Sequence, residues 1–264
     1  MSATLSDFTR DTFAHAGTTR DIYRRGSGPA VLVLAEIPGI TPKVLEFADR
    51  VAGIGCTAVV PHLFGDPGRE PSGAYATKTM LSLCVSREFS ALALHLPGTV
   101  VDWLRALAAD ERRRCGGPGV GVVGMCFTGN YGLAMAVDDN VIAPVLSQPS
   151  MPFAVGKKRR SEVGLSDEEL SKVKQRVTDE GLCVLGLRFT GDRLVPAERF
   201  ARLRKELGDG FIAVELDSSP GNPHGHPKVA HSVLTEHLQD REGTPTRAAL
   251  DQVLDFLRQR LLPA

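Results

Sequence analysis

Apolar strand-length segments and amphipathic helical segments alternate along most of the chain. Residues 30–35 form an uninterrupted apolar run, which is typical of a strand covered on both faces of a mainly parallel sheet. Thr41-Pro42 then supplies the cap and first position of a helix that ends near Gly53 or Gly55. Before them, the short alternating segments of residues 11–25 predict an antiparallel hairpin at the edge of the sheet.

The same alternation continues to the end of the sequence. Further strands are predicted at residues 57–60, 120–124, 141–146, 183–189 and 211–216. Helices are predicted within residues 74–113 and at 129–137, 166–178, 196–207 and 245–261, with a capping box at Ser166 and Glu169 and a candidate cap at Thr244. Strands that alternate with helices need crossover connections. We therefore predict one α/β domain, residues 1–264, with a mostly parallel central sheet flanked by helices on both faces.

Two stretches are too long to be short connections. Residues 149–165 are polar and contain a basic run at 156–160, so we expect an exposed loop whose charges face solvent. Residues 217–240 are rich in Pro, Gly and His. A loop of that length inside a compact domain is often functional.

Charge and cysteine content restrict the possible functions. Lys plus Arg and Asp plus Glu both number 31, and no long block carries one sign, so we expect no nucleic-acid partner. The apolar runs are too short for a membrane span, and the first residues lack the pattern of a signal peptide. We therefore expect a cytoplasmic protein that binds a small molecule. The five cysteines are scattered without a CxxC pair, which argues against structural zinc and against a disulfide framework.

The most informative segment is the turn around Cys126. A hydrophobic strand runs into Gly124, and a helix rich in small residues begins at Gly129. Such a turn exposes the nucleophile of α/β hydrolases, and the glycine two positions earlier permits its sharpness. A helix N-terminus favours a thiolate, and the Phe127 N–H can hold an oxyanion. A structural buried cysteine is the alternative, since Thr128 replaces the second glycine of the usual motif.

Four landmarks in order resemble the dienelactone hydrolase family, α/β hydrolases with a cysteine nucleophile. They are Glu36-Ile37-Pro38-Gly39, Gly124-Met125-Cys126-Phe127-Thr128-Gly129, Thr190-Gly191-Asp192 with Val195-Pro196, and His231-Ser232. The order nucleophile, acid, histidine is also that of the α/β-hydrolase fold. The resemblance implies an α/β-hydrolase fold and cleavage of a small ester or lactone by Cys126, His231 and Asp192, with no cofactor and no metal.

The choice of histidine rests on the resemblance, because the loop at residues 217–240 contains four of them. His231 is favoured since Ser232 follows it, as in the family. His224 stays the second candidate, because its spacing from Asp192 is nearer to that of the family. A metal site begun by His224 and His226 is disfavoured, since no further ligand lies close in sequence. Asp192 can orient the histidine, and a turn or helix cap is its ordinary alternative role.

The resemblance also suggests residues around the nucleophile. In the family, the glutamate that corresponds to Glu36 contacts the resting thiol and takes part in forming the thiolate. The Ile37 N–H is then the second oxyanion donor, and Arg87 and Ser232 bind substrate; a solvated helix arginine is the alternative for Arg87. The second carboxylate-binding arginine of the family is Thr235 here, which leaves the choice of lactone open.

Three functions are compatible with these residues. We favour acyl transfer through a thioester on Cys126. The alternatives are a broad carboxylesterase and a non-catalytic member of the fold that binds a metabolite or senses oxidants through its thiol. We expect a monomer or a homodimer.

Overall fold

A mostly parallel sheet forms the centre of the protein in the computed structural model, which describes residues 3–84, 99–151 and 156–262. Within these residues the sheet has eight strands in the order β1-β2-β4-β3-β5-β6-β7-β8. Strand β2 pairs antiparallel with β1 and with β4, and the other neighbours are parallel. The strands are β1 (Thr9–His15), β2 (Thr18–Gly26), β3 (Ala30–Leu34), β4 (Thr57–Pro61), β5 (Val120–Met125), β6 (Val141–Ser147), β7 (Val184–Phe189) and β8 (Phe211–Leu216). The predicted hairpin at the edge is therefore confirmed.

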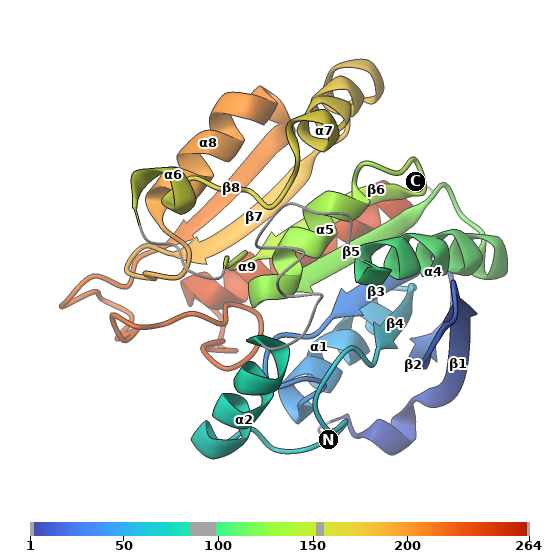
Figure 1. The fold of residues 1–264 in the computed structure, drawn as a ribbon. Coiled ribbons are helices and arrows are strands. Elements are labelled where there is room, and N and C mark those ends of the chain that lie inside the picture. The colour runs from blue at the N-terminus through green and yellow to red at the C-terminus, as the bar shows by residue number, and fades with distance from the viewer. Residues whose placement is uncertain (1–2, 85–98, 152–155, 263–264) are drawn as a thin grey trace.

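Helices cover both faces of this sheet (Figure 1). One face packs against α1 (Pro42–Gly53) and α9 (Pro245–Leu261). The other packs against α4 (Thr99–Cys115), α5 (Gly129–Met135), α7 (Asp167–Glu180) and α8 (Ala197–Leu207). The helices α2 (Gly73–Cys84) and α6 (Lys157–Arg160) lie in connections. This is the layered α/β architecture that the alternation predicted.

Strand β3 explains why the central strands have no polar positions. Val31 and Val33 belong to the apolar core shared with α1 and α9, whereas Leu32 and Leu34 belong to the core shared with α4 and α5. All four side chains are fully buried. A strand with helices on both sides has no solvent face, so its sequence is a continuous apolar run.

Two of the predicted helix caps are confirmed and the third has another role. The Thr41 hydroxyl accepts a backbone N–H of the first turn of α1 at 3.4 Å. Ser166 and Glu169 exchange side-chain to backbone hydrogen bonds of 3.1 and 3.2 Å at the start of α7. Thr244 occupies the N-cap position of α9, but its hydroxyl lies 2.6 and 2.7 Å from carbonyl oxygens of the preceding loop. It therefore fastens that loop instead of capping the helix.

The prediction of a wholly exposed loop at residues 149–165 is wrong in part. Ser150 and Met151 are buried at its start, and Val163 and Leu165 are buried at its end. Met151, Val163 and Leu165 join the apolar core on the side of α4 and α5, so the isolated apolar residues of a polar segment anchor both of its ends. Within the basic run, Arg160 pairs with a carboxylate of α8 at 2.8 Å, and both side chains stay about 40% exposed, so this pair lies at the surface.

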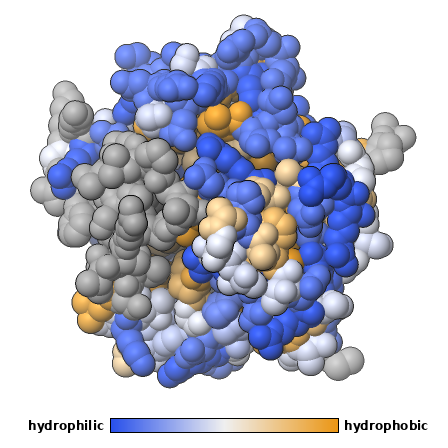
Figure 2. All heavy atoms as spheres, turned by 45° about the vertical axis from the view of Figure 1, so that its right-hand side comes forward, coloured by the Kyte–Doolittle hydropathy of each residue, from blue (hydrophilic) through white to orange (hydrophobic). Residues whose placement is uncertain are grey.

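The surface is mostly polar on the face drawn in Figure 2, where apolar side chains form small separate patches among hydrophilic ones. None of the helices within the described ranges combines the length and the apolar character that crossing a membrane requires.

Candidate active site

The predicted site residues gather beyond the carboxyl ends of the central strands. Glu36 follows β3, Cys126 follows β5, Asp192 follows β7, and His231 lies in the long loop after β8. In an open α/β sheet, the crevice beyond these strand ends is the usual place for a ligand. The topology thus brings together residues that lie far apart in the sequence.

The turn at Cys126 is sharp and strained. Cys126 has a φ of 58°, a left-handed conformation that residues other than glycine rarely adopt. A Cβ atom at Gly124 would lie 2.2 Å from the carbonyl oxygen of Thr128, so this position requires glycine. One short turn of 3-10 helix, Cys126–Thr128, leads directly into α5. The strand, turn and helix therefore have the geometry of a nucleophile elbow.

Thr128 shows how the elbow forms without its usual second glycine. The Thr128 side chain is fully buried, accepts the Met125 N–H at 2.9 Å and lies 2.9 Å from the carbonyl oxygen of Leu34. The close backbone approach falls one residue later, since a Cβ at Gly129 would lie 2.9 Å from the Cα of Pro149. Sequence reasoning did not predict that Thr128 ties the elbow to the end of β3.

Buried Asp192 and partly buried His231 form a hydrogen-bonded pair. His231 Nδ1 donates to Asp192 Oδ2 at 2.6 Å, and the other carboxylate oxygen accepts the Leu194 N–H at 2.9 Å. The alternative histidine, His224, is exposed, and its ring lies beside that of His226. The structure therefore pairs His231, and not His224, with the predicted acid.

The thiol of Cys126 lies close to His231. Burial lowers the pKa of His231, but the charge of Cys126 and the hydrogen bond with Asp192 outweigh burial and raise this pKa well above its usual value. His231 Nε2 is buried and makes no regular hydrogen bond within the described residues, which leaves this nitrogen for the thiol. The sulfur also lies 3.0 Å from the hydroxyl oxygen of Ser150, a residue that was not predicted.

Glu36 is buried among neutral hydrogen-bond donors. Its Oε2 accepts from the Ser232 hydroxyl at 2.6 Å and from Gln148 Nε2 at 3.2 Å, and its Oε1 accepts from the Thr235 hydroxyl. The sequence prediction placed Glu36 against the resting thiol and Ser232 against the substrate. In the described part of the chain, neither oxygen of Glu36 hydrogen-bonds Cys126, and Glu36 and Ser232 hydrogen-bond each other instead.

Gln148 is another buried residue that the sequence prediction missed. It has a φ of 39° and no exposed surface. Its side chain accepts the Val233 N–H at 3.2 Å while it donates to Glu36, so it joins the end of β6 to the loop that carries His231. A signal was available, because the buried strand ends on polar Ser147 and is followed directly by polar Gln148.

His237 holds the backbone beside His231. His237 Nδ1 accepts the N–H of Ser232 at 3.2 Å and the N–H of His231 at 3.3 Å. Burial is the main reason that the pKa of His237 is lowered, and a neutral ring keeps Nδ1 available as an acceptor. The sequence placed His237 in the functional loop but indicated no role for it.

The two predicted oxyanion donors lie after adjacent strands. Ile37 belongs to the turn after β3, which closes with a hydrogen bond of 2.7 Å from the Gly39 N–H to the Glu36 carbonyl, and Phe127 follows Cys126 after β5. Their oxyanion role stays a prediction. Arg87 lies outside the described residues, so its assignment to substrate binding also stays a prediction.

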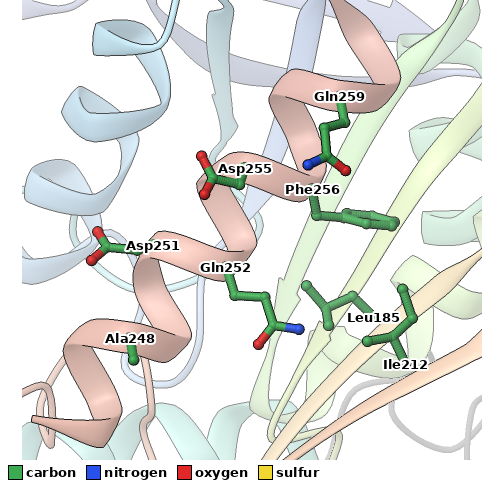
Figure 3. Close-up of a pocket in the computed structure, with 8 residues that line it drawn as sticks. All are labelled: Leu185, Ile212, Ala248, Asp251, Gln252, Asp255, Phe256 and Gln259. Carbon is green, nitrogen blue, oxygen red and sulfur yellow. The ribbon is translucent and has the colours of Figure 1, made fainter.

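A separate groove lies between α9 and the strands β7 and β8 (Figure 3). It has a volume of about 540 Å³, and the side chains of Gln252 and Phe256 project from α9 on the side of Leu185 and Ile212. None of the predicted site residues lines this groove. In the described ranges, no three His, Cys, Asp or Glu side chains are grouped to hold a metal ion.

The family model described as the dienelactone hydrolase family matches residues 22–261. The chain belongs to the dienelactone hydrolase family. As a member of the dienelactone hydrolase family it is a carboxylic ester hydrolase. No curated protein matches the chain at a significant level.

Solved structures of the dienelactone hydrolase family and of esterases share the fold. A putative dienelactone hydrolase from Klebsiella pneumoniae subsp. pneumoniae MGH 78578 is 18% identical, with a TM-score of 0.63 over 96% of this chain and 98% of that chain. A dienelactone hydrolase-like promiscuous phosphotriesterase from metagenomic libraries is also 18% identical, with a TM-score of 0.62 and the same coverage of 96% and 98%. A cold-adapted esterase from an Arctic intertidal metagenomic library is 16% identical, with a TM-score of 0.56 over 96% and 92%. The predicted α/β-hydrolase fold is confirmed.

Proposed function

We propose that this member of the dienelactone hydrolase family cleaves a small ester or lactone through a thioester on Cys126. The observation that carries the proposal is the pair of His231 and Asp192, joined at 2.6 Å, next to a thiol on a strained elbow. A thiol that sits at a helix start beside an imidazole is readily converted to a thiolate. The chain acts as a single hydrolase domain in this proposal.

Acylation begins when His231 takes the proton of the Cys126 thiol. Asp192 holds the ring and stabilises the imidazolium that forms. The thiolate attacks the carbonyl carbon, a C–S bond forms, and the N–H groups of Ile37 and Phe127 hold the oxyanion. The C–O bond of the ester then breaks, and His231 gives its proton to the departing alkoxide.

Deacylation repeats these steps with water. His231 takes a proton from water, the hydroxide attacks the thioester carbonyl, and the C–S bond breaks with its electron pair returning to the sulfur. Because a thiolate leaves more easily than an alkoxide, the first tetrahedral intermediate tends to expel the thiolate and reverse. Activated esters and enol lactones, which have better leaving groups, therefore suit a cysteine nucleophile best.

Trapping of the acyl group tests the proposal. We expect brief mixing with p-nitrophenyl acetate, followed by an acid quench and peptide mapping, to place an acetyl group on Cys126. The Cys126→Ala variant controls for acetylation of other side chains. If Cys126→Ala keeps its turnover and another of its residues is acetylated to the same extent as in the parent, the thioester is rejected. Oxidation of Cys126 by peroxide without any ester turnover would favour the thiol sensor.

A further inference from the structure

The nucleophile has a second polar neighbour besides its histidine. Ser150 lies in the segment after β6, and its hydroxyl oxygen is 3.0 Å from the sulfur of Cys126. Only 6% of Ser150 is exposed, so bulk water competes little for this contact. No step of the acyl-transfer chemistry proposed above uses this hydroxyl.

The backbone of Ser150 is fixed to the elbow from two sides. The Ser150 N–H donates to the carbonyl oxygen of Cys126 at 3.1 Å. Asn130, which is 1% exposed, donates through Nδ2 to the carbonyl oxygens of Ser150 at 2.6 Å and of Phe127 at 3.0 Å. These bonds hold the serine against the same turn that strains Cys126. The backbone of Ser150 therefore keeps its hydroxyl beside the sulfur before charge develops there.

The direction of the Ser150 contact follows from the charge on the sulfur. Either group can donate while Cys126 is a neutral thiol. Once its proton has moved to His231, the sulfur can only accept, so the Ser150 hydroxyl donates. Hydrogen bonds to a charged partner are shorter and stronger than neutral ones, so the contact favours the thiolate over the thiol.

We propose that Ser150 is a further catalytic residue, whose hydroxyl donates a hydrogen bond to the Cys126 thiolate. The inference rests on the proposed function of Cys126. Ser150 keeps its own proton throughout. It stabilises the sulfur anion before attack and again during deacylation, when the C–S bond breaks and the electron pair returns to the sulfur.

The Ser150 hydrogen bond acts mainly on the fraction of Cys126 that is present as thiolate. A hydrogen bond that stabilises a thiolate also makes it a weaker nucleophile. Where the thiolate is only partly formed, the gain in its population exceeds this loss of nucleophilicity, and at high pH, where the thiolate is fully formed, only the nucleophilicity differs. A change at Ser150 should therefore alter the pH dependence of thiol reactivity more than its limiting rate.

Alkylation of Cys126 by iodoacetamide, followed by peptide mapping from about pH 5 to about pH 9, measures this population. We expect Ser150→Ala to slow alkylation about tenfold near pH 6, because one hydrogen bond to a charged group is lost, and to leave the limiting rate at high pH no lower than that of the parent. Ser150→Thr keeps a hydroxyl and should stay within about twofold of the parent.

Ser147→Ala is the matched control, because it removes another buried serine hydroxyl, three residues earlier at the end of β6, whose partner is Gln148 and not the sulfur. It should leave the alkylation profile unchanged. A Ser150→Ala profile that superimposes on that of the parent, in a variant with the same circular dichroism spectrum, would overturn the inference. A profile that shifts equally in Ser147→Ala would do so too, since it would indicate a general loosening.

The alkylation test separates this inference from the proposed function. If Cys126→Ala still hydrolyses esters, the proposed function fails, yet alkylation still reports whether Ser150 stabilises the thiolate. If Cys126→Ala is inactive and Ser150→Ala keeps the parent profile, only the inference about Ser150 fails.

Discussion

At the scale of single residues, the pairing of Asp192 with His231 decides which imidazole nitrogen faces the thiol. The buried carboxylate binds Nδ1 at 2.6 Å and leaves Nε2 for the sulfur. Asp192→Asn keeps the shape but presents an amide that can stabilise the wrong tautomer. We expect kcat on p-nitrophenyl acetate to fall by about 10³ to 10⁴, as loss of the triad carboxylate does in serine hydrolases. Asp217→Asn changes an exposed aspartate and is the control. A kcat for Asp192→Asn within threefold of the parent value, measured in the same steady-state assay, would contradict the role of the acid.

The protonation of His231 should also appear in stability. Burial lowers its pKa, yet Cys126 and Asp192 together raise it well above its usual value. A group whose pKa is higher in the folded state stabilises the fold below its unfolded pKa, and this stabilisation is lost as the pH rises through the folded pKa. The difference in unfolding free energy between the parent and His231→Gln should therefore be largest below about pH 6 and shrink at higher pH. Urea unfolding at several pH values measures it, and a difference that grows with pH would argue against the raised pKa.

At the scale of elements, the strand, turn and helix around Cys126 depend on the close backbone approach at Gly124. An added Cβ at Gly124 would lie 2.2 Å from a backbone oxygen that cannot move without distorting α5. We expect Gly124→Ala to lower the free energy of unfolding by about 3 kcal/mol or more. Gly53→Ala is the matched control, because a Cβ there has no atom within 4 Å, and it should change stability by less than about 1 kcal/mol. Equal stabilities of the two variants in urea titrations would refute the strained elbow.

The elements themselves were largely predictable from the sequence, because burial on both faces makes the central strands continuous apolar runs. The elbow was predictable too, because Gly124 and Cys126 lie close together in sequence, directly at the end of a predicted strand. The hydrogen-bond donors around Glu36 were not predictable, since Thr235 lies 199 residues away and nothing in the local sequence marks it as a partner. Ser150 was hidden inside a segment whose polar composition indicated an exposed loop. The choice of His231 over His224 rests on the resemblance. The spacing from Asp192 favours His224, but the structure pairs His231 with Asp192.

At the scale of the molecule, the two apolar cores lie on opposite faces of one sheet and share its strands. A single domain should therefore unfold in one transition. The chain has one tryptophan, Trp103, which is 1% exposed in α4 and donates to the carbonyl oxygen of Thr18 at 3.1 Å. Its fluorescence reports on the core at one end of the sheet, whereas far-ultraviolet circular dichroism reports on all elements. We expect coincident urea midpoints, and two separated transitions would contradict the single domain.

The proposed thiol-hydrolase mechanism is tested most directly by burst kinetics with p-nitrophenyl acetate. The proteins compared are the parent, Cys126→Ala, His231→Ala and His224→Ala. We predict a burst of p-nitrophenol in the parent and in His224→Ala, and loss of both the burst and the turnover in Cys126→Ala and His231→Ala. Unchanged turnover in Cys126→Ala would contradict the account, because the ester would then be cleaved without the thiol on which every step depends.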